Sequence, residues 1–289
     1  MQIQAYIPKG PLKEFIDVIH FISGKEMGTG IAFPRMQQVI IINMGSPFST
    51  SEIYSTSRPS TETDSTIWMN GKQDHPFLLG NTGITSMYAI GLKLGMLPYF
   101  ADLPAIETNN LALGAEHWTS RGIFELRERL LYCRDSTEGF LVIEQYLLQQ
   151  LQKRTFPDLD RVKWMGRMMY THTVEEICRQ SGMTRKQLRK VAQQHFGDAV
   201  KNIQGIIRLN KTLKMIAETA TASPTVPTLS AIHPYFDQSH FIHDFKARTG
   251  ITPLQYRRLC QHFPFIRHTP NFIALPQETF LQFISNADR

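Results

Sequence analysis

The feature that most limits the fold is a helix-start pattern that occurs twice between residues 173 and 197. Thr173 stands three residues before Glu176, and Thr184 stands three residues before Gln187. In this capping-box spacing each threonine accepts a backbone hydrogen bond from the first turn, and the longer side chain returns one to the threonine backbone. Gly182 lies between the two predicted helices and suits a tight turn. Helix, glycine turn and helix together predict a helix-turn-helix unit.

A second unit of the same plan is expected further along the chain. A longer helix at about 198–218 follows the first unit and ends before a proline-containing segment. Beyond it we expect a short helix at 228–233, a turn, and another helix whose N-cap is Asp237. Phe241 and Phe245 are four residues apart, so they share the inner face of that last helix. The C-terminal half is therefore predicted to be all-α.

The first half of the chain has the period of strands. The run "QQVIIINMGSPF" reads as a buried strand followed by its turn, and "SMYAIGLKL" reads as another strand. Glycines between these runs suit the turns and bulges of a small barrel or sandwich. From about residue 120 the spacing becomes helical in "IFELRERLLYC" and "EGFLVIEQYLLQQLQKR", which predicts an αα-hairpin. The fold class is therefore expected to be α+β.

Charge is unevenly distributed along the chain. The net charge is +6, and residues 157–262 contain 16 Lys and Arg against 8 Asp and Glu, while the remainder has 15 against 17. The positive excess thus lies in the predicted helix-turn-helix region, which indicates a polyanionic partner. Charge alone does not separate nucleic acid from a membrane surface.

Hydrogen-bond donors gather on the outward faces of the second helix of each unit. Such side chains meet phosphates and base edges in a major groove. A connecting helix of roughly 20 residues would be ~30 Å long, close to the ~34 Å repeat of B-DNA. Both helices are thus expected to enter successive major grooves, aimed the same way. The predicted DNA contacts are Arg185, Lys186, Arg189 and Lys190 in the first unit and Gln238, Ser239, His240, His243 and Lys246 in the second.

Three other interpretations of the second helix are weaker. His240 and His243 are three apart, but no cysteine follows and the nearby carboxylates are only Asp237 and Asp244, so a zinc site is not favoured. A catalytic site would need an activated nucleophile or paired carboxylates in a pocket, and this helix offers neither. A merely solvated basic face would not explain two units of matching plan.

The segment from Val174 to Arg258 resembles the AraC/XylS family of bacterial transcriptional regulators. The resemblance is strongest in "DQSHF…DFKARTGITPLQYRR", which carries Gly250, Pro253 and Tyr256. It implies two helix-turn-helix units joined by a linker helix. The front half is similar, more faintly, to sensor domains fused to some of these regulators, which implies a cupin-like β-barrel before the helical hairpin. The expected domains are 1–154, 155–262 and an apolar extension at 263–289.

The family resemblance also implies partners. Double-stranded DNA and RNA polymerase are expected, no cofactor or metal is expected, and a homodimer is one option. Barrel mouths commonly bind small ligands, so a small-molecule effector is expected there, at residues the sequence does not identify. The alternative is a barrel that serves only as a scaffold or a dimerisation surface.

A rival hypothesis is a metal-dependent cupin-type enzyme that the basic half recruits to DNA. Such an enzyme needs clustered ligands, commonly His-x-His on one strand. His20, His75 and His117 are isolated in the sequence, which disfavours this hypothesis, and we expect a non-enzymatic protein.

Composition bounds the compartment and the end of the chain. Three cysteines without a C-x-x-C pair favour a reducing compartment, and no apolar run approaches the ~20 residues that span a bilayer. No secretion signal is recognised at the start, so a cytoplasmic location without membrane contact is expected. The segment 263–289 holds five phenylalanines, too many for a free tail, and is expected to pack on a domain or on a second subunit.

Overall fold

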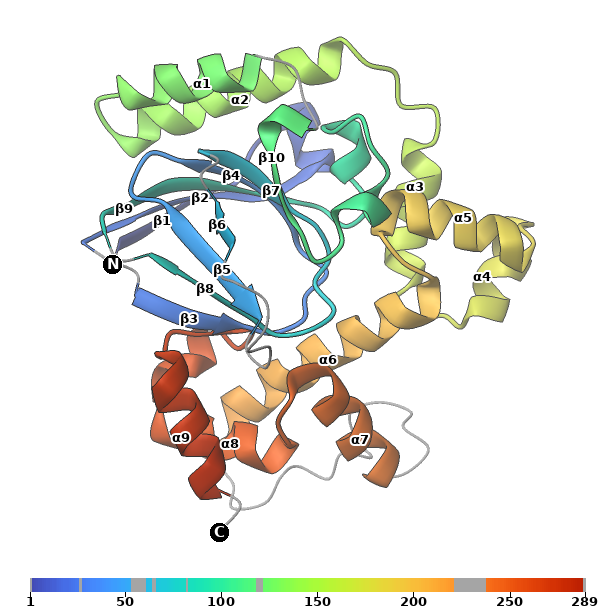
Figure 1. Ribbon diagram of the computed structural model, residues 1–289. Helices are drawn as coiled ribbons and strands as arrows, with labels where there is room; N and C mark the ends of the chain where they lie inside the picture. Colours follow the sequence, from blue (N-terminus) through green and yellow to red (C-terminus); the bar gives the residue numbers. More distant parts are fainter. Residues whose placement is uncertain are drawn as a thin grey trace.

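The computed structural model describes residues 2–25, 28–52, 61–63, 66–81, 83–117, 122–220 and 238–287. The N-terminal half holds two antiparallel sheets, and helices surround them (Figure 1). The six-stranded sheet has the order β1 (Gln2–Tyr6), β2 (Ile16–Gly24), β9 (Thr85–Leu92), β4 (Gln38–Asn43), β7 (Ile67–Asn70) and β10 (Ala112–Gly114). The five-stranded sheet has the order β11 (Phe272–Ile273), β3 (Gly28–Ala32), β8 (Phe77–Asn81), β5 (Phe48–Glu52) and β6 (Thr61–Thr63).

The central strand β4 explains why the run of isoleucines is continuous. All six residues of β4 are buried, because both faces of its sheet are covered. Ile40 and Ile42 point toward one hydrophobic cluster, while Val39 and Ile41 point toward another, as the two-residue period of a strand requires. Ile40 pairs with Ile90 of β9, which fixes the register.

The space between the two sheets is filled by apolar side chains. Phe48 of the five-stranded sheet meets Trp68 of the other sheet with ring centroids 5.8 Å apart, and Met87 joins them. Among the described strands, no hydrogen-bonded ladder connects the two sheets. The expected cupin-like barrel is thus a pair of facing sheets in the described part of the chain, rather than a closed barrel.

The predicted αα-hairpin is confirmed and covers the outer face of the six-stranded sheet (Figure 1). It consists of α1 (Gly122–Leu131) and α2 (Ser136–Gln152), and Asp135 caps α2 by accepting a 2.9 Å hydrogen bond from the backbone N–H of Glu138. Phe140 of α2 lies against Tyr88 of β9 with ring centroids 5.6 Å apart. This contact joins the hairpin to the sheet.

The C-terminal half is helical, as predicted. Its helices are α3 (Leu159–Met168), α4 (Val174–Ser181), α5 (Arg185–Phe196), α6 (Val200–Thr219), α7 (Gln238–Thr249), α8 (Pro253–His262) and α9 (Gln277–Ala287). In Figure 1, α6 runs obliquely between α5 at one end and α7 and α8 at the other. None of the described helices combines the length and apolar character that crossing a bilayer requires.

The apolar extension returns to the N-terminal sheets. Its strand β11 pairs antiparallel with β3, so that Phe272 lies opposite Ala32. Phe280 of α9 is fully buried in a cluster that includes residues of β3, α6 and α8. Residues 263–287 therefore connect the second helix-turn-helix unit to the five-stranded sheet.

Candidate nucleic-acid interface

Both predicted capping boxes of the first unit are confirmed. The Glu176 carboxylate accepts a hydrogen bond from the Thr173 backbone N–H at 2.8 Å, and Gln187 Oε1 accepts one from Thr184 N–H at 2.9 Å. The hydrogen bonds from the backbone and side chain of Thr173 hold the pKa of Glu176 below its ordinary value. These contacts set where α4 and α5 begin, and each is made between residues only three positions apart.

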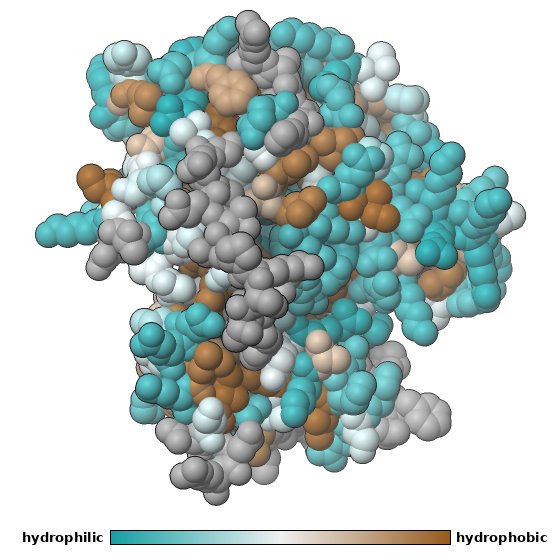
Figure 2. All heavy atoms as spheres, in the orientation of Figure 1, coloured by the Kyte–Doolittle hydropathy of each residue, from teal (hydrophilic) through white to brown (hydrophobic). Residues whose placement is uncertain are grey.

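The first unit exposes the predicted donors of α5. Leu188, Ala192 and Phe196 are buried on the inner face of the helix. Arg185, Lys186, Arg189 and Lys190 are all exposed on the outer face, and Figure 2 shows a mostly hydrophilic surface over α4 and α5. Arg185 also donates to Glu175 of α4 at 2.6 Å, an exposed ion pair.

The second unit exposes its predicted donors as well. Phe241 and Phe245 are buried against the rest of the unit, whereas the five donors of α7 are exposed. A shallow hollow of about 440 Å³ is lined by Ser239, Ile242, His243, Lys246 and Ala247. The expected first helix of this unit, at 228–233, and the N-cap Asp237 lie outside the described residues. The exposed donors of α7 are Gln238, Ser239, His240, His243 and Lys246.

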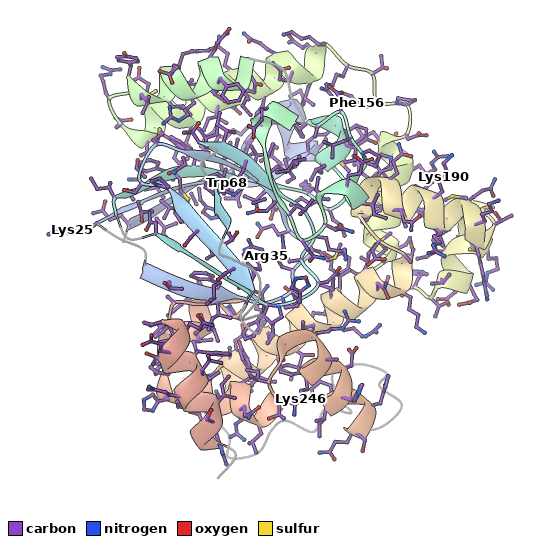
Figure 3. All side chains as sticks on the ribbon, in the orientation of Figure 1. Lys25, Arg35, Trp68, Phe156, Lys190 and Lys246 are labelled. Atoms are coloured by element: carbon purple, nitrogen blue, oxygen red, sulfur yellow. The ribbon has the colours of Figure 1, made fainter. Side chains whose placement is uncertain are left out.

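The connecting helix α6 holds the two units apart. It has 20 residues, which gives a length of ~30 Å. Ile203 near its start lies in the hydrophobic cluster that contains Leu188 of α5, and Leu213 near its end lies in the cluster that contains Phe245 of α7. Lys190 on α5 and Lys246 on α7 therefore mark two separate basic surfaces (Figure 3).

The first unit is attached to the N-terminal region at the end of α5. Lys72 is fully buried, and its ammonium group donates to Asp198 at 3.0 Å and also to Asp74. Asn109 donates to the carbonyl of Gly197 at 2.6 Å. We call this contact, made by Lys72, Asp74, Asn109, His195, Gly197 and Asp198, the first dock.

Gly197 is required at the first dock for two reasons. Its φ of +85° is the left-handed conformation that ends α5, which disfavours any residue with a Cβ. A Cβ at this position would also lie 2.5 Å from the side-chain oxygen of Asn109. The same glycine therefore ends the helix and permits the close approach to the N-terminal region.

Burial and hydrogen bonding set the protonation states of the first dock. Burial lowers the pKa of His195, whose Nδ1 lies 3.4 Å from the carbonyl oxygen of Gly95, so the neutral ring is favoured. Burial alone would raise the pKa of Asp198, but hydrogen bonds from Lys72, the Ala199 N–H and Asn202 outweigh it and hold the pKa below its ordinary value. The docked state thus contains a neutral histidine and an ionised aspartate.

The second unit is attached through apolar side chains. Phe33, which follows β3, meets Tyr256 of α8 edge-on with ring centroids 5.8 Å apart. Phe280 of α9 fills the same cluster, and the Tyr256 hydroxyl donates to the carbonyl of Pro270 at 2.9 Å. We call this contact, made by Phe33, Tyr256, Pro270 and Phe280, the second dock.

Neither dock was evident from the sequence. Lys72 and Asp198 are 126 positions apart, so no local spacing could indicate their pairing. A lysine between glycine and glutamine reads as a surface residue. The phenylalanines of the extension did predict packing, but they did not identify the surface that receives them.

The histidines of the front half lie in different segments, with His20 on β2 and His75 between β7 and β8. His20 lies on β2 opposite Ala89, and burial lowers its pKa. The side chain of His117 lies outside the described residues, and among those described no three His, Cys, Asp or Glu side chains group as metal ligands.

Comparison with known proteins assigns the C-terminal half. Residues 177–259 match the family described as "Helix-turn-helix domain". No curated protein matches the chain significantly in sequence. Among solved structures, ToxT from Vibrio cholerae is 11% identical, with 90% of this chain and 99% of that chain covered and a TM-score of 0.41. ToxT with a bound unsaturated fatty acid is 12% identical, with coverage of 83% and 94% and a TM-score of 0.40.

The domain assignment follows from the sequence match over residues 177–259, which covers α5, α6 and α7 and parts of α4 and α8. The two confirmed capping boxes and the buried inner faces of α5 and α7 are the local structure that such a domain requires. A domain of this type binds DNA. Residues 177–259 are therefore a helix-turn-helix domain of the AraC type, the domain that the sequence resembles.

Proposed function

We propose that this chain reads two successive major-groove segments of double-stranded DNA and thereby regulates transcription in a sequence-specific manner. The observation that carries the proposal is the exposure of donor side chains on both α5 and α7, at opposite ends of a 20-residue helix. The ~30 Å length of that helix is close to the ~34 Å between successive grooves on one side of a duplex.

Individual contacts follow from side-chain chemistry. Arg189 is a candidate for bidentate contact with guanine, and Gln238 for adenine. Lys186, Lys190 and Lys246 suit phosphate contacts, because a lysine presents a point charge without a planar fork. The other proposed contacts are Arg185, Ser239, His240 and His243.

Control of this activity is assigned to the N-terminal region. Both helix-turn-helix units are packed against it, the first through the first dock and the second through the second dock. We propose that a signal received by the N-terminal region changes these contacts and so changes how the two helices are presented to DNA. RNA polymerase and a second copy of the chain remain proposed partners.

The test is selection of DNA sites by the full chain, followed by affinity measurements on the selected sequence. We expect log Kd to rise linearly with log salt concentration, because phosphate neutralisation releases counterions. Arg189→Ala should cost about 1–3 kcal/mol at particular bases if Arg189 reads a base edge. Arg134→Ala is the matched control, because Arg134 is exposed outside the helical domain and pairs with Glu138.

Two results would count against the proposal. Selection that returns no common sequence would remove the claim of sequence-specific reading. A loss of affinity on Arg189→Ala that is equal for all sequences would make Arg189 a phosphate contact.

A further inference from the structure

A cavity of about 1210 Å³ lies between the N-terminal region and the C-terminal helices. Its walls come from the segment that follows β3, the end of β9, α3, α6, and the extension at Pro270 and Asn271. It is separate from the space between the two sheets, which Phe48 and Trp68 fill. The volume exceeds that of most small-ligand sites, which are roughly 300–1,000 Å³.

The cavity wall carries a marked excess of positive charge. Six of the lining side chains are cationic and two, Glu14 and Asp17, are acidic. Glu14 already pairs with Lys163, and Lys214 pairs with Glu218. Within the described residues, no carboxylate lies at ion-pair distance from the other four cations. These four are Arg35, Lys93, Arg167 and Lys211.

Arg35 is the side chain that most clearly lacks a partner. Its backbone is fixed by hydrogen bonds with Gln73 at 3.0 and 3.2 Å, and its guanidinium lies 5.9 Å from the centre of the Phe77 ring. Its Nε atom is buried, and no acceptor in the described part of the chain receives a hydrogen bond from it. Burial lowers the pKa of Arg35, and within the described residues no carboxylate offsets the lost hydration. Arg35 lies between the sheets and α6 (Figure 3).

The cavity wall is held in place before any ligand arrives. Asn210 of α6 donates to the carbonyl of Pro34 at 2.9 Å, and Asn271 donates to the side-chain oxygen of Asn210. The Phe33 N–H donates to the carbonyl of Asn271 at 2.8 Å. Three segments that are far apart in the sequence thus meet beside Arg35.

We infer that this cavity binds a small organic anion that carries two or more negative charges, and that the anion fixes the helical domain against the N-terminal region. A ligand with one carboxylate would leave most of the four cations uncompensated. Phosphate esters and polycarboxylates share the required chemistry, because both present oxygen pairs to a guanidinium fork. Tyr170 and the apolar walls from Leu92, Leu94 and Ile207 accommodate the body of the molecule. As a means of regulation, this inference rests on the proposed function; as a binding site, it stands apart from it.

The experiment is calorimetric titration of the full chain, without DNA, at constant ionic strength. The probes are ATP for phosphate esters, citrate for polycarboxylates, pyrophosphate, and octanoate as the singly charged comparison. We expect saturable binding of one equivalent of ATP or citrate, with octanoate at least tenfold weaker. Tighter binding of ATP would identify the ligand class as phosphate esters, and tighter binding of citrate would identify it as polycarboxylates. The amides of residues 33, 35, 36 and 207–214 should gain protection from hydrogen exchange in the bound state.

Variants test whether the cavity is the site. Arg35→Gln should weaken binding about tenfold or more, because it removes a charge-assisted contact. Lys93→Gln is a second test at another cation of the cavity wall, and Arg134→Gln is the control of equal charge change on an exposed loop. Unaltered affinity in both cavity variants would overturn the inference.

The remaining outcomes are also decisive. Failure of ATP, citrate and pyrophosphate alike, or octanoate binding as tightly as they do, would overturn the assigned ligand class. If Arg35→Gln weakens DNA binding in the absence of these anions and no probe binds, the cation cluster serves DNA instead. Because the titration contains no DNA, failure of the anions to bind would leave the DNA-binding proposal unaffected. Failure of the chain to bind DNA would likewise leave the anion-binding inference unaffected.

Discussion

At the first dock a buried lysine, two aspartates and a neutral histidine hold the end of α5, whereas at the second dock aromatic rings hold α8 and the extension. Helix α5 of the first unit and helix α8 of the second are therefore attached to the N-terminal region by contacts that differ in kind. A polar contact gains little net free energy, because water solvates the same groups when the contact opens. Burial of apolar surface has no such compensation.

The difference indicates which unit can be released. Opening the first dock returns Lys72, Asp198 and His195 to water, and it removes the burial that lowers the pKa of His195. Opening the second dock exposes Phe33, Tyr256 and Phe280, at roughly 1.5–3 kcal/mol for each large apolar side chain. We therefore expect the first unit to separate more readily, while the second unit stays attached to the sheets.

The largest effect is expected at the second dock. Phe280→Ala should lower the free energy of unfolding by about 3–5 kcal/mol, since Phe280 is fully buried and its removal leaves a cavity. Urea denaturation measures this loss, and hydrogen exchange should rise in β3 and α8. Phe265→Ala is the control, because Phe265 is 41% exposed in the same extension and should cost much less.

If Phe280→Ala prevents folding, Phe280→Leu keeps the test usable with an expected cost below ~1.5 kcal/mol. Equal losses for Phe280→Ala and Phe265→Ala would show that the extension is not a structural part of the second dock.

A smaller effect is expected at the first dock. Lys72→Met should cost about 1–3 kcal/mol, less than for a fully buried pair, because the Asp74 and Asp198 side chains are 40% and 23% exposed. The loss should be smaller when Asp198→Asn is also present, since the double variant leaves no unpaired aspartate at that position. Lys201→Met on the exposed face of α6 is the control. Additive losses would mean that Lys72 and Asp198 do not interact.

The sequence predicted those parts of the fold that depend on near neighbours. Thr184 and Gln187 are three residues apart, so their reciprocal hydrogen bonds follow from the local pattern alone. The isoleucines of β4 likewise indicate a strand buried on both faces. The exposure of Arg189 and His243 follows from helical periodicity once Leu188 and Phe245 are placed inside.

Contacts between distant segments could not be predicted in this way. Lys72 reaches Asp198 only because the chain returns through α5, and Phe272 pairs with Ala32 across almost the whole sequence. The surroundings of the Arg35 Nε atom, which has no partner among the described residues, likewise depend on the positions of α6 and Asn271 in the folded chain. Each of these features is set by tertiary packing, which single-sequence patterns do not encode.

The last prediction uses acid to separate the two docks. Burial lowers the pKa of His195 from its ordinary value of 6.5, so the undocked histidine binds protons more readily than the docked one. The stability of the first dock is therefore complete above pH 6.5 and falls as the pH drops toward the lowered value. Asp198 adds a further loss below its ordinary pKa of 3.8, because its folded pKa is also lowered. Hydrogen exchange at 193–197, corrected for intrinsic rates, should therefore rise between about pH 7.5 and about pH 5.5, while exchange at 255–259 of α8, at the second dock, should not. His195→Gln should remove the rise in that range. A rise that persists in this variant, or one of equal size at both docks, would contradict the assignment of the first dock as the polar and releasable one.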